Sequence, residues 1–115
     1  RSFIYSDDVS EAMLKVMKKS KNGEIYHITN EKMYSIKEVV NVICKVMDKK
    51  FDDHVTIEHE RPGKDFIYDL SGNKIKSLRW KPKTSLINGI LETKKWIEEN
   101  YLCLKKIKLK YEHLK

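Results

Sequence analysis

Stretches with helical spacing of apolar residues alternate with stretches that have strand spacing. Apolar side chains recur every three or four residues in 9–17, 36–47 and 86–97, which predicts three amphipathic helices. Apolar and polar residues alternate in 24–29 and 54–60, which predicts two strands. This order indicates an α/β layer fold. Two strands are too few for a complete doubly wound sheet, and 115 residues suffice for one small domain.

Polar residues mark the starts of the predicted helices. Four are placed as N-caps: Asp8, Ser35, Ser71 and Ser85. A glutamate follows each of the first two after three residues, as in a capping box. Gly89 lies inside the last predicted helix, where it costs about 1 kcal/mol relative to alanine. We therefore expect another part of the chain to pack closely against Gly89.

The charge of the chain is unevenly distributed. Its net charge is +7, and the end of the chain from Leu104 carries five lysines against one glutamate. Without stacking aromatics or clustered arginines this run favours a solvated end, which disfavours nucleic acid as a partner. No apolar run approaches the ~20 residues of a membrane span, so no membrane contact is expected. Two isolated cysteines, Cys44 and Cys103, favour a reducing, cytoplasmic setting.

Sequence motifs for catalysis and cofactor binding are absent. The chain has no GxGxxG or Walker loop and no HExxH or zinc-finger spacing. Arginine is rare in this chain. Its planar guanidinium can contact two phosphate oxygens at once, whereas the ammonium group of lysine is a point charge. Arg61 lies in the turn "ERPGKD" and is equally consistent with a surface residue and a phosphate ligand. From composition and spacing alone, the chain is an α/β piece with a candidate anion site.

The ordered segments resemble the C-terminal part of extended short-chain dehydrogenases/reductases. "RSFIYSDDVSEA" is similar to their R-x-F-x-Y-V-x-D-x-x-x-A segment, and "GEIYHIT" to their G-E-x-Y-N-I-G strand. "SIKEVVNVI" is similar to S-I-x-E-L-V. "ERPGKDFIYDLSGNKIKSLRWKP" resembles the R-P-G-H-D to L-G-W-x-P block, and a G-I-x-x-T-V-x-W helix follows. Over about residues 1–100 the pattern is most like the dTDP-glucose 4,6-dehydratase branch.

The resemblance implies that this is the C-terminal substrate-binding portion of an NAD(P)-binding Rossmann-type enzyme. The chain begins without methionine, and we expect a fragment that lacks the N-terminal Rossmann half. That half binds NAD in the family and supplies the catalytic residues, so no catalytic, cofactor-binding or metal residue is predicted here. A nucleotide-sugar-binding region is expected over 1–101 and a basic tail over 102–115.

The resemblance also assigns binding residues. Arg1 and Arg61 match arginines that contact the diphosphate of the nucleotide sugar in the family. Asp65 and Tyr68 match positions around the same loop, where they are expected to shape the turn, with ligand contact as the alternative. These four residues are the predicted substrate-binding set. The implied partners are a nucleotide diphosphate sugar, the missing Rossmann half and a second copy in a homodimer.

Family members of this branch oxidise the sugar at C4, eliminate water across C5 and C6 and return the hydride to C6. This chain alone is expected to be inactive. Two alternatives stay open: a fragment of a UDP-sugar 4-epimerase or decarboxylase, and a non-catalytic interaction module with a basic tail.

Some positions depart from the family pattern. Ser6 replaces Val, His27 replaces Asn, and Lys64 stands where His is common. Arg79 replaces the glycine of L-G-W, and if that glycine has a positive φ, arginine there is strained. The neighbouring Trp80 is expected to be a packed aromatic.

Overall fold

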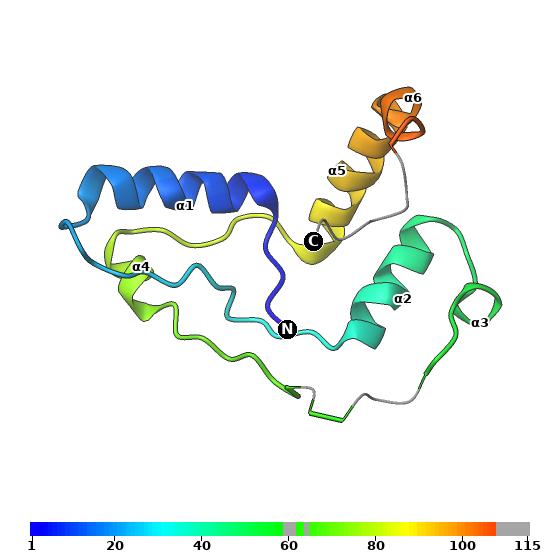
Figure 1. Cartoon of the computed structure of the whole chain (residues 1–115), viewed down its shortest axis with the longest axis horizontal. Helices are drawn as coiled ribbons and strands as arrows, with labels where there is room; N and C mark the ends of the chain where they lie inside the picture. The colour runs from blue at the N-terminus through cyan, green and yellow to red at the C-terminus, as the bar shows by residue number, and fades with distance from the viewer. Residues whose placement is uncertain (59–61, 64, 108–115) are drawn as a thin grey trace, which may run out of the picture.

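Helices supply the regular secondary structure of this protein. The computed structural model describes residues 1–58, 62–63 and 65–107. Within them the helices are α1 (Ser6–Lys19), α2 (Ile36–Val46), α3 (Phe51–His54), α4 (Asn73–Ser77), α5 (Leu86–Glu99) and α6 (Tyr101–Leu104). Extended segments join these helices (Figure 1). The predicted boundary between residues 101 and 102 falls inside α6, and residues 108–115 lie outside the described part.

The predicted strands are not formed, so the α/β expectation is wrong for the described part of the chain. Residues 24–29 and 55–58 are not in strands, and residues 59–60 lie outside the described part. The one strand-like pairing among the described residues is an isolated antiparallel bridge between Ser2 and Met33. Strand spacing alone does not make a sheet, because every strand needs a neighbour to pair its N–H and C=O groups.

Two packed regions meet at the N-terminal segment. On one side, α1 and α4 flank a small core of Ala12, Ile75 and Trp80 (Figure 1). Ile4, Val16, Tyr26 and Ile28 pack around that core. On the other side, α2 packs against α5 and α3, and α5 continues into α6. The prediction that Trp80 is a packed aromatic is confirmed, since only 2% of its surface is exposed.

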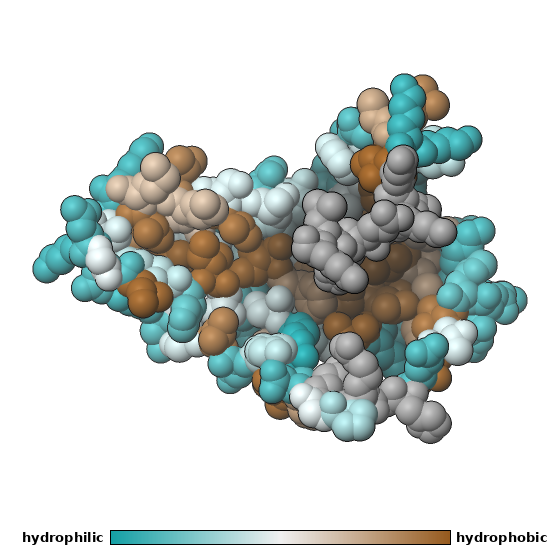
Figure 2. All heavy atoms as spheres, viewed as in Figure 1, coloured by the Kyte–Doolittle hydropathy of each residue, from teal (hydrophilic) through white to brown (hydrophobic). Residues whose placement is uncertain are grey.

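The structure is open, and much of its apolar surface is exposed. Its radius of gyration is 17.5 Å, whereas a compact domain of this length would have about 13 Å. Apolar side chains form a broad band across the face between α1 and α5 (Figure 2). Such a surface is unusual for a complete monomeric domain. In the described residues, no helix has the length and apolar character needed to span a membrane.

Two of the predicted N-caps are confirmed and two are wrong. Ser35 forms the complete capping box of α2, and Ser85 Oγ accepts from the backbone N of Asn88 at 3.2 Å. Helix α1 begins at Ser6, so Asp8 lies inside its first turn. Its carboxylate accepts hydrogen bonds from the backbone N of Lys83 and Thr84 and does not cap the helix. Gly72, and not Ser71, is the N-cap of α4. For Asp8, donors from a distant part of the chain outcompete the local helix N–H groups.

Gly89 packs closely, as predicted. A Cβ built on Gly89 would lie 3.4 Å from Cδ2 of Tyr5, which is an ordinary contact distance. We expect Gly89→Ala to raise the free energy of unfolding by about 0.5–1 kcal/mol, because alanine loses less backbone entropy in a helix.

Denaturant unfolding followed by circular dichroism would measure this change. Gly23→Ala is the matched control, because Gly23 has a φ of 81° and alanine is strained there. The control should lose stability. A loss of stability in Gly89→Ala would contradict the packing described here.

Candidate functional site

Three of the four predicted binding residues lie together. The Arg1 guanidinium donates from Nη2 to the Asp65 carbonyl at 2.7 Å and from Nη1 to the Phe66 carbonyl at 3.2 Å. Its Cζ lies 4.0 Å from the centre of the Tyr68 ring, a cation–π contact. The Tyr68 hydroxyl donates to Oδ2 of Asp65 at 2.5 Å. Arg61 lies outside the described residues.

Backbone pairing fixes the position of Arg1. Its backbone N donates to the Tyr34 carbonyl at 2.7 Å, and the backbone N of Tyr34 donates to the Arg1 carbonyl at 2.9 Å. Ser2 Oγ then accepts from the backbone N of Asn30 at 2.8 Å. Arg1 therefore projects from a braced segment onto the loop that carries Asp65 and Tyr68, which are more than 60 residues away in sequence.

In the group formed by Arg1, Asp65 and Tyr68, the guanidinium uses only part of its hydrogen-bonding capacity among the described residues. Guanidinium has five N–H donors, and two of them are used by the loop carbonyls. Tyr68, whose ring lies against this guanidinium, is 53% exposed. Gly63 turns the chain just before this loop with a φ of 76°, a conformation that favours glycine.

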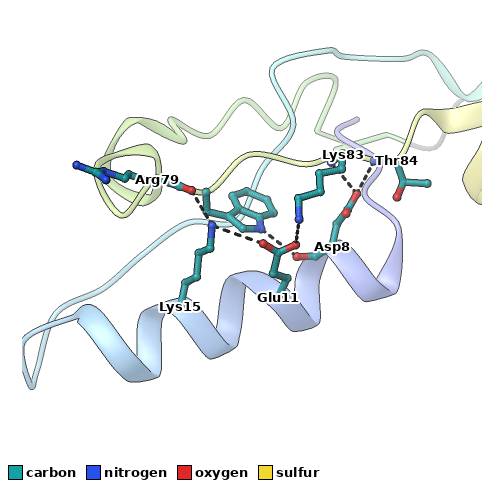
Figure 3. Close-up of polar contacts among 7 residues, drawn as sticks. Asp8, Glu11, Lys15, Arg79, Lys83 and Thr84 are labelled. Carbon is teal, nitrogen blue, oxygen red and sulfur yellow. Dashed lines mark hydrogen bonds and ion pairs between the residues drawn. The ribbon is translucent and has the colours of Figure 1, made fainter.

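A second polar cluster joins α1 to the connector before α5 (Figure 3). The buried carboxylate of Asp8 accepts from the backbone N of Thr84 at 2.8 Å and of Lys83 at 3.1 Å. The Trp80 indole N–H donates to the Asp8 carbonyl at 3.2 Å. Sequence reasoning missed this role of Asp8, since nothing local distinguishes a helix cap from an anchor for distant amides.

Lysines complete this cluster at the surface. Lys83 Nζ donates to Glu11 at 2.6 Å, and Lys15 Nζ donates to the Arg79 carbonyl at 2.6 Å. The hydrogen bond from Lys83 is the main cause that lowers the pKa of Glu11, and the same bond raises the pKa of Lys83. Both shifts favour the charged pair at neutral pH. The pair is exposed, so its role is to orient the connector and not to dominate stability.

Arg79 has the strained backbone that its sequence position suggested. Its φ is +58°, in the left-handed region. A residue with a Cβ pays roughly 1–2 kcal/mol for this conformation, which glycine adopts at little cost. The sharp turn after α4 places Trp80 in the core, and this explains why the chain accepts the conformation.

The residues present do not fit NAD. A dinucleotide site needs a glycine-rich turn between a strand and a long helix, so that backbone N–H groups reach the diphosphate. The four glycines are far apart in sequence, and Gly72 precedes α4, which has only five residues. Within the described residues no three His, Cys, Asp or Glu side chains lie together as a metal site requires.

Comparison with curated proteins identifies related sequences, although no family model matches the chain. The chain is 38% identical over 106 residues to the human dTDP-D-glucose 4,6-dehydratase. It is 31% identical over 107 residues to dTDP-glucose 4,6-dehydratase 1 of Escherichia coli K12. A trifunctional UDP-glucose 4,6-dehydratase, epimerase and reductase of Arabidopsis thaliana is 30% identical over 100 residues. These alignments cover 87–88% of this chain.

Solved structures point to the same proteins. The fold matches a crystal structure of dTDP-glucose 4,6-dehydratase from Bacillus anthracis in complex with NAD, with a TM-score of 0.76 and 30% identity. The match covers 89% of this chain and 32% of that one. The chain spans about 30% of the length of the human and E. coli relatives. The resemblance predicted from the motifs is confirmed.

Proposed function

We propose that this chain, which matches part of the dTDP-glucose 4,6-dehydratases in sequence and fold, is the nucleotide-sugar-binding portion of an NAD-dependent 4,6-dehydratase. In this role Arg1 and Arg61 hold the diphosphate, and the loop of Asp65 and Tyr68 shapes the site around it. NAD and the catalytic residues belong to the N-terminal Rossmann half, so the chain alone binds substrate without turnover.

The observation that carries this proposal is the assembly of Arg1, Asp65 and Tyr68 from two distant segments. A guanidinium held by two carbonyls and an aromatic ring has a fixed direction before any ligand arrives. A diphosphate gains most from donors that are already oriented, because less conformational entropy is lost on binding. Such fixed donors suit binding and orientation of a substrate.

Relatives support the reaction class more strongly than the nucleotide. The related proteins described above are 4,6-dehydratases, and this favours a dehydratase over the epimerase and decarboxylase alternatives. Their names include both dTDP-glucose and UDP-glucose enzymes. We assign dTDP-glucose as the substrate because the human relative has the highest identity among the three.

The exposed apolar face fits a chain that completes its fold against a Rossmann half. Large side chains such as Ile25, Ile57 and Leu102 are more than 70% exposed. The two segments predicted as strands, 24–29 and 54–60, would gain sheet partners only from another part of the protein. Homodimer formation and a cytoplasmic location stay predictions for the complete protein.

Arg1→Ala is expected to weaken binding of dTDP-glucose by at least about tenfold, because a charge-assisted hydrogen bond to phosphate is worth roughly 1.5–3 kcal/mol. Isothermal titration calorimetry with dTDP-glucose and UDP-glucose would measure the affinities. Arg1→Lys keeps the charge but loses the planar fork of the guanidinium. Its affinity for dTDP-glucose should therefore lie between those of the wild type and Arg1→Ala. The control Lys18→Ala lies at the end of α1 and should bind as the wild type does.

Equal affinity of the wild type and Arg1→Ala would contradict the proposed site. Turnover of dTDP-glucose by the pure chain with NAD would contradict the assignment of catalysis to the missing half. Salt-sensitive binding of an oligonucleotide, abolished by deletion of residues 104–115, would instead favour the interaction-module alternative.

A further inference from the structure

A cavity separate from the Arg1 site lies between α4 and two extended segments. Its volume is about 510 Å³, within the range of small-molecule sites, and segments 29–31 and 79–82 line it together with α4. Its apolar lining consists of Pro82 together with Ile75 and Trp80, of which only 1% and 2% of the surface is exposed. None of its lining residues is Arg1, Asp65 or Tyr68.

A glycine leaves room at one end of this cavity. A Cβ built on Gly72 would lie 3.0 Å from Cγ2 of Thr29, which is closer than real Cβ atoms comfortably allow. Gly72 therefore lets the start of α4 lie directly against the 29–31 segment. Both Gly72 and Thr29 line the cavity.

The cavity carries uncompensated positive charge. Lys76, Arg79 and Lys81 line it, against one carboxylate, Glu31. Glu31 pairs with Lys76, and the hydrogen bond from Lys76 is the main cause that lowers the pKa of Glu31. In the part of the chain that the structure describes, no carboxylate forms an ion pair with Arg79 or Lys81.

Arg79 stands where glycine would be easier to accommodate. Its φ of +58° strains any side chain with a Cβ. Only its carbonyl joins the cluster on α1, by accepting from Lys15, and its guanidinium points away from Asp8 and Glu11 (Figure 3). The turn that places Trp80 in the core accounts for this backbone conformation, but it leaves the choice of arginine over glycine at a cavity wall to be explained.

We propose that this cavity binds an organic phosphate monoester. The phosphate contacts Arg79 and Lys81, and the carbon body of the ligand lies against Pro82. The guanidinium fork of Arg79 matches two phosphate oxygens, and Lys81 adds a point charge. The ligand class follows from the pairing of these two cations, which form no ion pair within the described part of the chain, with an apolar wall at Pro82, because inorganic phosphate would leave that wall uncovered.

Titration of the whole chain with phenyl phosphate, inorganic phosphate and phenol tests the proposal. ¹⁵N chemical shifts would report the affinities, and phenyl phosphate should bind at least about tenfold more tightly than either fragment. Arg79→Gly should lose at least about tenfold in affinity for phenyl phosphate. The same variant should raise Tm by about 4–8 °C, because the backbone strain is relieved.

Two controls separate this cavity from a general effect of positive charge. Lys18→Gln and Lys19→Gln replace exposed lysines in the last turn of α1, and both variants should bind phenyl phosphate as the wild type does. Unchanged affinity in Arg79→Gly would overturn the proposal. Binding of inorganic phosphate as tight as that of phenyl phosphate, or equal losses in Lys18→Gln, would also overturn it.

Discussion

Replacing Trp80 with alanine is expected to lower the free energy of unfolding by about 3–5 kcal/mol, the range for a buried large aromatic. Trp80 is 2% exposed and belongs to the core with Ala12 and Ile75. Its indole N–H also donates to the Asp8 carbonyl. Because so few residues are buried, no other large side chain can fill the space that tryptophan leaves. Urea unfolding followed by circular dichroism would measure the loss.

Two further variants keep this prediction testable if Trp80→Ala fails to fold. Trp80→Phe retains most of the apolar surface and loses only the indole hydrogen bond. It should therefore lower the free energy of unfolding by less than Trp80→Ala does. Trp96→Ala is the matched control, because Trp96 is 54% exposed on α5. Equal losses for Trp80→Ala and Trp96→Ala would contradict the core described here.

Replacing Asp8 with alanine is expected to lower the free energy of unfolding by about 2–3 kcal/mol, the second largest effect predicted. The carboxylate accepts from the backbone N–H groups of Lys83 and Thr84, and its removal leaves these donors unpaired. An unsatisfied buried donor costs roughly 1–3 kcal/mol. The connector that leads into α5 would also lose its attachment to α1. Thermal unfolding monitored by circular dichroism would give the change.

Asp8→Asn is the conservative control, since the amide keeps one acceptor oxygen and should retain part of the stability. Glu11→Gln tests the exposed part of the same cluster and should cost less than about 1 kcal/mol. A larger loss in Glu11→Gln than in Asp8→Ala would show that the surface lysine contacts, and not the buried carboxylate, hold the connector.

The helices could be predicted from the sequence because their signals are local. The spacing of apolar residues located α1, α2 and α5, and the caps at Ser35 and Ser85 depend on residues three positions away. The strands failed because a sheet depends on neighbours. Alternation in 24–29 gives a strand-like pattern, but Ile25 is 75% exposed and no described strand pairs with it.

The candidate site was predictable only in part. Family motifs placed Arg1, Asp65 and Tyr68 in one site, and their contacts in the structure join them. The loop carbonyls that bind Arg1 have no sequence signal, because every residue has a carbonyl. The anchor role of Asp8 was also invisible, since its donors lie 75 and 76 positions later in the chain.

One measurement tests most directly whether this chain is a nucleotide-sugar-binding portion: a ¹⁵N chemical-shift titration with dTDP-glucose. We expect saturable shifts that concentrate at residues 2, 33–34 and 65–68, where Arg1 is braced and contacts the loop. Phosphate bound at Arg1 would perturb these amides first. No saturable shift at millimolar ligand, or shifts confined to the lysine-rich end, would contradict the proposed function.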